Sequence, residues 1–148
     1  MRFHLIDKID AVEPKRSVRA RKLTSASEDY WETGDAGLTM PPPFLLEALC
    51  QAGTWLIMIS TERRQRAALL SIGTVGWHDD VHPGDVLELA AEVGSFGKDT
   101  AVVSGTVSVD GRVVLEAQDV MCALIDADDL ANADDTERLE RMLSRGVA

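Results

Sequence analysis

The chain has 148 residues, 45% of them hydrophobic, with a formal net charge of −10 at pH 7. This content suits one globular domain with a real core. The excess of acidic residues argues against nucleic-acid binding, because neutralising phosphates requires concentrated positive charge, so we expect small molecules or other proteins as partners.

The first third of the chain is predicted to contain two strands and a loop. Residues 3–12 predict one strand, and residues 16–23 predict a second in which arginines share one face. Residues 24–39 are rich in Ser, Asp, Gly and Thr and predict a loop anchored by Tyr30 and Trp31. Charges throughout the N-terminus exclude a signal peptide, so we expect a cytoplasmic protein.

Residues 44–64 predict the long helix of the body. The helix is apolar nearly all round, which predicts burial along its length, and its apolar run is shorter than a membrane span requires. Glu47 would then lie on a buried face, where a charge is costly and needs a reason. Gln51, four residues further on, lies on the same helix face and is expected to hold the Glu47 carboxylate by a hydrogen bond. The alternative is a buried glutamate satisfied by local backbone donors.

After the helix the pattern changes to period two. It predicts four strands, at residues 69–77, 86–93, 100–109 and 113–125, followed by an acidic linker and a short helix at residues 136–145. One helix buried along its length needs a sheet that wraps it. The order therefore predicts an α+β hot-dog fold, an antiparallel sheet around one central helix. We expect this domain to span residues 1–126, with the linker and the terminal helix in residues 127–148.

Four motifs resemble those of the β-hydroxyacyl-ACP dehydratases of type II fatty-acid synthesis. The stretch MPPPFLLEALCQAG at residues 40–53 is similar to the central-helix signature of that family. FHLID at residues 3–7, VHPGD at 81–85 and VSVDGRVVLEA at 107–117 are similar to its opening strand, its turn and its closing hairpin. The resemblance implies dehydration of a 3-hydroxyacyl chain on an acyl carrier protein, in fatty-acid or polyketide biosynthesis, without a metal or cofactor.

The dehydration requires a base for the α-proton, a group that handles the leaving hydroxyl, and donors for the thioester oxygen. In the family these are a histidine, a Glu or Asp, and a helix-start glycine N–H. Glu47 matches the carboxylate. The histidine position falls on Thr33, and the glycine position falls on Pro42, which has no N–H to donate. The histidines of this chain lie outside the loop before the helix, at His4, His78 and His82, and a structural or solvent-exposed role is expected for each.

The resemblance implies a dimer in which one chain supplies the histidine and the other the carboxylate. We predict that this chain donates Glu47 to the site of a homologous histidine-bearing subunit, and that it has little activity alone. A homodimer that is active by itself, through Thr33 or Asp35, is the less favoured alternative, because neither group has a pKa near neutrality unless strongly perturbed.

Two further surfaces are predicted. An acyl slot along the helix would be lined by Cys50, Trp55 and Met58, unless these residues are plain core. Both Cys50 and Cys122 are expected to be buried free thiols. An acidic carrier protein would dock on basic residues, which are either solvated or form a patch. The candidates are Arg63, Arg64 and Arg66 after the helix, or Lys15, Arg16, Arg19, Arg21 and Lys22 on the second strand.

Two rival functions remain open from the sequence. The first is a hot-dog thioesterase in which Asp35 or Glu47 activates water against an acyl thioester. The second is a non-catalytic subunit that binds an acyl group or stabilises a partner.

Overall fold

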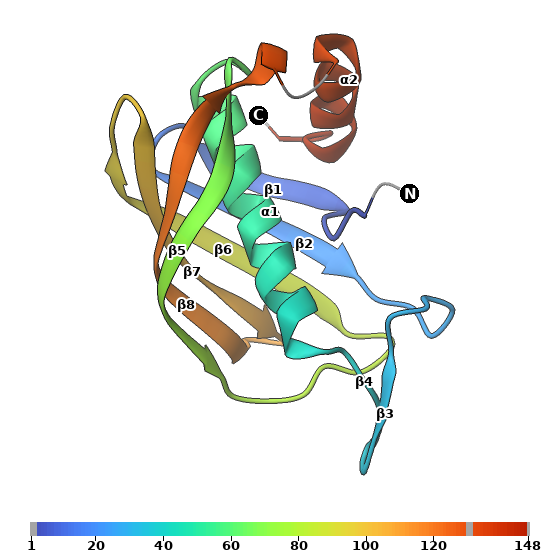
Figure 1. Cartoon of the computed structure of the whole chain (residues 1–148). Coiled ribbons are helices and arrows are strands. Elements are labelled where there is room, and N and C mark those ends of the chain that lie inside the picture. Colours follow the sequence, from blue (N-terminus) through green and yellow to red (C-terminus); the bar gives the residue numbers. More distant parts are fainter. Residues whose placement is uncertain (1–2, 130–131, 148) are drawn as a thin grey trace.

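The computed structural model describes residues 3–129 and 132–147. Six strands form one antiparallel sheet in the order β1-β2-β6-β7-β8-β5, and α1 lies along its concave face (Figure 1). The strands of this sheet are β1 (Lys8–Glu13), β2 (Ser17–Leu23), β5 (Gln65–Trp77), β6 (Val86–Phe96), β7 (Thr100–Val109) and β8 (Arg112–Asp126). The other elements are the hairpin strands β3 (Glu32–Gly34) and β4 (Gly37–Thr39), the helices α1 (Pro42–Ser60) and α2 (Ala133–Leu143), and a 3-10 turn at Ala127–Asp129. The predicted hot-dog architecture is confirmed.

The edges of the predicted elements differ from the observed ones for local reasons. The first strand begins only at Lys8, because the segment before it crosses the open side of α1, where the Leu5 N–H donates to the side chain of Gln51. The helix ends at Ser60, since Glu62 and Arg63 adopt positive φ values of 53° and 65° and cannot continue it.

The central helix is not buried all round, and this corrects the prediction made from its composition. Leu45, Leu49 and Leu56 pack into the core, but an open stripe runs along the opposite side, on which Pro43 and Glu47 are exposed. The Glu47 carboxylate is therefore not a buried charge within this chain. At 19 residues α1 is also long and apolar enough to cross a membrane by length and composition, but half of it is buried against the sheet, as in a core helix.

Close packing of α1 on the sheet depends on Gly105 of β7. A Cβ atom at this position would lie 2.3 Å from the Ala90 carbonyl oxygen and 2.9 Å from Leu49 Cδ1. We expect Gly105→Ala to lower the free energy of unfolding by about 1–3 kcal/mol, the usual cost of overpacking a core, as measured by urea denaturation. Gly94→Ala on β6 is the matched control, because its Cβ would come no closer than 3.7 Å to another atom. Equal losses from both substitutions would contradict the steric explanation.

Candidate active site

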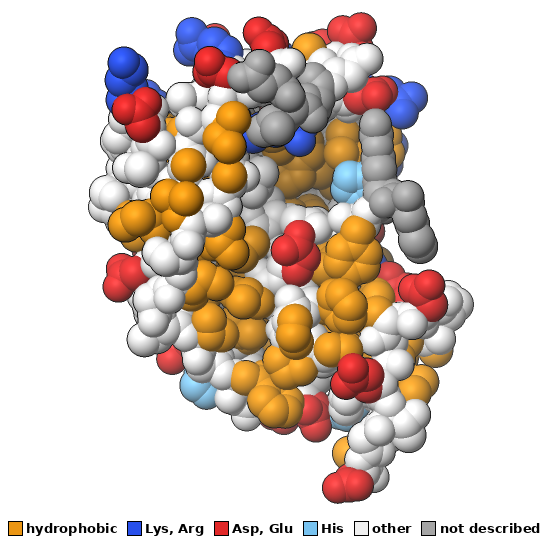
Figure 2. Space-filling view, viewed as in Figure 1, with side chains coloured by type: hydrophobic (Ala, Val, Ile, Leu, Met, Phe, Trp, Pro, Cys, Tyr) orange, Lys and Arg blue, Asp and Glu red, His pale blue; other side chains and the backbone are white. Residues whose placement is uncertain are grey.

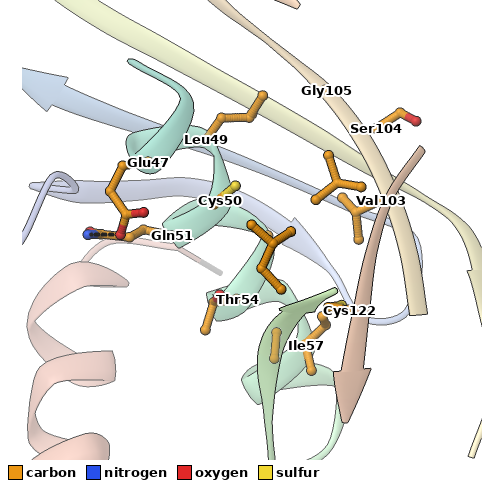
Figure 3. A pocket seen from close by; sticks show the side chains of 14 residues that line it. Glu47, Leu49, Cys50, Gln51, Thr54, Ile57, Val103, Ser104, Gly105 and Cys122 are labelled. Carbon is orange, nitrogen blue, oxygen red and sulfur yellow. Dashed lines mark hydrogen bonds between the residues drawn. The ribbon is translucent and has the colours of Figure 1, made fainter. Parts of the chain in front are cut away.

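Glu47 lies on the open stripe of α1 and is held by Gln51. The Gln51 side-chain amide donates from Nε2 to Glu47 Oε1 at 3.0 Å and to the Phe3 carbonyl at 3.1 Å. Its Oε1 accepts the Leu5 N–H at 2.8 Å. The predicted hydrogen bond is present (Figure 3). The N-terminal segment, which the sequence did not connect to the site, fixes the orientation of the amide and so of the carboxylate.

An apolar cavity of about 220 Å³ opens beside Glu47, between α1 and strands β5, β7 and β8. Figure 3 shows Cys50 and Ile57 on the helix and Val103 on β7 around this space. Its walls suit an alkyl chain, because they are mostly hydrocarbon. Burial, with a smaller effect from the nearby Glu47 carboxylate, raises the pKa of the Cys50 thiol to about 11. The thiol therefore stays protonated at neutral pH and is a wall of the cavity rather than a nucleophile.

A second hollow, of about 520 Å³, lies on the other side of Glu47. The N-terminal segment, α1, the start of β5 and α2 surround it. Glu47, Gln51 and Thr54 line both spaces, so the two meet at the carboxylate. The structure places Trp55 and Met58 along this second hollow and not in the apolar cavity, with side chains that are almost fully buried. Of the three residues predicted to line an acyl slot, only Cys50 lines the apolar cavity.

The start of α1 offers no free backbone donor in its first three residues. Pro42 and Pro43 have no N–H, and the Phe44 N–H already donates to the Pro41 carbonyl at 2.9 Å. An oxyanion beside this helix start would therefore lack the hydrogen bonds that stabilise it.

The loop that should carry a catalytic base forms the β3–β4 hairpin instead, which projects from the body of the molecule (Figure 1). Thr33 and Asp35 are both exposed there, and neither belongs to the lining of the two spaces beside Glu47. Tyr30 anchors the preceding segment, as predicted, with its ring 5.6 Å from that of Phe44.

The three histidines have separate environments. His82 donates from Nδ1 to the Leu38 carbonyl at 2.9 Å and so holds the hairpin. His78 lies 3.4 Å from a carboxylate oxygen of Glu116. His4 is exposed and lines the second hollow together with Glu47. In residues 3–129 and 132–147 no hydrogen bond or ion pair joins His4 to Glu47. Sequence reasoning missed this proximity because it placed His4 inside a paired strand.

The arginines after the helix have structural contacts that the sequence did not reveal. Arg63 Nη1 pairs with Glu140 Oε2 at 2.8 Å, and Arg66 Nη2 donates to Thr136 Oγ1 at 2.8 Å. Both contacts tie α2 to the body. Arg64 remains exposed at the surface. Two of the three arginines predicted for docking thus make contacts within the chain, and carrier-protein docking on them stays a prediction.

The basic residues of β2 are also largely paired. Lys22 is buried and lies 2.6 Å from a carboxylate oxygen of Glu28. Arg21 forms a bidentate ion pair with Asp10 and holds the pKa of that carboxyl below its usual range.

Among the described residues no group of three or more His, Cys, Asp or Glu side chains is placed to hold a metal ion.

Comparisons with known proteins identify relatives of this chain. Residues 1–118 match the model of the FabA-like domain family. A 3-hydroxyacyl-[acyl-carrier-protein] dehydratase FabZ from Nitratiruptor is 34% identical over 124 residues, which covers 78% of this chain and 84% of the relative. FabZ from Bacillus subtilis is 31% identical over 122 residues, with the same coverage of 78% and 84%.

Solved structures show the same fold at low identity. The dehydratase heterocomplex ApeI:P from Xenorhabdus doucetiae aligns with a TM-score of 0.64 and 18% identity, covering 91% of this chain and 88% of that one. A hypothetical thioesterase with coenzyme A from Streptococcus pneumoniae aligns with a TM-score of 0.60 and 20% identity, covering 78% and 84% of the two chains.

Proposed function

The chain belongs to the FabA-like family and is homologous to FabZ-type 3-hydroxyacyl-ACP dehydratases, and on this premise we propose that it is one subunit of a heteromeric dehydratase. In this proposal it donates Glu47 to a composite site, and a homologous subunit brings the histidine and the backbone donor. We place the reaction in the cytoplasm, in fatty-acid or polyketide biosynthesis, with an acyl carrier protein presenting the substrate.

The observation that carries this proposal is that the chain has the carboxylate of a dehydratase site but lacks the other catalytic groups. Glu47 is oriented by Gln51 at the mouth of an apolar cavity. The helix start beside it has prolines where a donor is needed, and the loop position of the base is Thr33. The base and the backbone donor are lost together, while the carboxylate and the residue that orients it are retained. This pattern fits a chain that supplies its carboxylate to the active site of another subunit.

The chemistry divides between the two subunits. The partner's histidine removes the proton from C2 of the 3-hydroxyacyl thioester, and the partner's backbone N–H groups stabilise the charge that develops on the thioester oxygen. The C3–O bond breaks, and protonated Glu47 gives its proton to the departing hydroxyl. Water and the 2-enoyl thioester are the products. Before the next cycle the histidine releases the proton that it took from C2, and Glu47 takes one up.

The free edge of β5 is suited to a partner subunit. This strand pairs with β8 on one side and ends the sheet on the other. It exposes large apolar side chains at Leu69, Leu70, Val75 and Trp77. Figure 2 shows hydrophobic side chains spread over the face on which α1 lies open. A long apolar edge strand invites pairing with another chain, and here it adjoins the cavity beside Glu47.

We expect a charge on this edge to prevent assembly. Leu70 is 57% exposed and is not part of the cavity lining, so Leu70→Asp should leave the fold intact and abolish the complex with a histidine-bearing homologue in size-exclusion chromatography with light scattering. Met142→Asp on α2 is the control, because Met142 is 63% exposed and lines a hollow with His4 and Ile6 of the N-terminal segment and with no residue of β5. Assembly that survives Leu70→Asp would place the interface elsewhere.

The direct test of the proposed function is turnover by the mixed complex. The purified chain is combined with a histidine-bearing hot-dog homologue from the same pathway, and conversion of 3-hydroxyacyl-ACP to enoyl-ACP is followed by mass spectrometry. Hydrolysis of acyl thioesters by this chain alone would support the rival thioesterase function instead.

A further inference from the structure

Arg66, at the start of β5, has an unused hydrogen-bond donor. Its Nη2 donates to Thr136 Oγ1 on α2. Its Nε is buried and has no hydrogen-bond partner among the described residues. A buried guanidinium N–H without an acceptor is costly, and such groups are normally satisfied by water or by a bound ligand. Arg66 lines the second hollow, so an acceptor placed there would lie beside its side chain, although Nε itself has almost no exposed surface.

The second hollow connects Arg66 with Glu47. Glu47 and Met58 both line it. Met58 lies eleven positions after Glu47 on α1, so the two residues are about 17 Å apart along the helix axis at 1.5 Å per residue. Arg66 lies toward the Met58 end, because the turn after α1 folds back there and the Arg63 N–H donates to the Met58 carbonyl at 2.6 Å. Gln51 and Thr54 lie between these ends and supply an amide and a hydroxyl.

The positive charge that lines the second hollow is at its Arg66 end. Arg66 is the one Lys or Arg among its described lining residues. The other ionisable groups there are Glu47, His4 and Asp135, and Asp135 has an interaction of its own. A ligand that carries an anionic oxygen near Arg66 and is mostly neutral near Glu47 would match these charges.

We propose that Arg66 binds the phosphate of a phosphopantetheine arm that runs along the second hollow. The thioester of the arm would lie at Glu47 and the acyl chain in the apolar cavity. The amide groups of the arm would face Gln51 and Thr54, which can both donate and accept hydrogen bonds. This inference rests on the proposed function for its ligand, since an acyl carrier protein and coenzyme A both present such an arm.

The test is binding of two small ligands to the purified full-length chain, by isothermal titration calorimetry. Phosphopantetheine should bind about tenfold more tightly than pantetheine, the worth of one charge-assisted hydrogen bond. Arg66→Gln should remove this difference and leave pantetheine binding unchanged. Arg64→Gln is the matched control, because Arg64 is exposed and lines neither space beside Glu47. Thr136→Val controls for loosening of α2, and it should preserve the preference for the phosphate.

Several outcomes would overturn the inference. They are equal affinity of the unmodified chain for the two ligands, no measurable binding of phosphopantetheine, and a preference that survives Arg66→Gln. Coenzyme A separates the two sources of the arm. If it binds like phosphopantetheine, the shared phosphate is recognised, whereas a coenzyme A preference that persists in Arg66→Gln would assign recognition to the nucleotide. Because no turnover is measured, the failure of this inference is distinct from failure of the dehydratase proposal.

Discussion

In the proposed heterodimer, Glu47→Gln is expected to reduce turnover of a 3-hydroxyacyl-ACP by about 10²–10⁴-fold, the usual contribution of a general acid or base. The amide keeps the shape of the side chain and can still meet Gln51, whose Nε2 donates to Glu47 at 3.0 Å, but it can neither give nor take the proton. Steady-state kinetics with an enoyl-ACP readout measures the effect, and light scattering confirms that the complex persists.

The matched control is Asp35→Asn, a carboxylate-to-amide change on the exposed β3–β4 hairpin. It should leave turnover within about twofold of the unmodified complex, since surface changes away from a site have small effects. A silent Glu47→Gln together with an inactivating Asp35→Asn would show that the carboxylate of this chain has been wrongly assigned.

The purified chain without a partner is expected to turn over 3-hydroxyacyl-ACP far more slowly than about 1 s⁻¹, the lower end of ordinary enzyme rates. The loss of one oxyanion donor alone costs about 10²–10³-fold, and here the helix start has Pro42 and Pro43 in place of donors. No histidine lies in the loop before it. Single-turnover assays at high enzyme concentration, with the histidine-bearing partner as the positive control, measure the residual rate.

His4 makes this prediction sharper, because it lines the second hollow together with Glu47. If the chain alone proves active and His4→Asn removes that activity, then His4 serves as a base within one chain and the composite site is unnecessary. If the weak residual rate is unchanged by His4→Asn, the histidine has only the exposed role expected for it.

The sheet could be predicted from the sequence because its signals are local. The Asp110–Gly111 turn fixed the hairpin between β7 and β8, and residues 100–109 were assigned with the observed bounds of β7. The β3–β4 hairpin was missed, since two strands of three residues rich in Gly and Thr have no periodicity to detect. Short polar strands are set by tertiary context.

The site was harder to predict, and for two reasons. The open side of α1, around Cys50 and Thr54, has the same apolar composition as a helix face that is buried within the chain. Composition alone cannot separate the two, and the predicted burial of Glu47 is therefore wrong. The contacts of Arg63 and Arg66 join residues 77 and 70 positions apart. A run of arginines carries no local sign of such partners, and these two side chains hold α2 in place.

The free edge of β5 also has a consequence for how much of this protein a cell can keep. Thirteen residues of strand, with Leu69, Leu70 and Trp77 exposed, form a surface that aggregates or is recognised by quality control when nothing covers it. If the proposed partner covers this edge, molecules made in excess of that partner should be lost by proteolysis or precipitation. The abundance of the partner would then set the abundance of this chain, whatever the relative rates at which the two are synthesised.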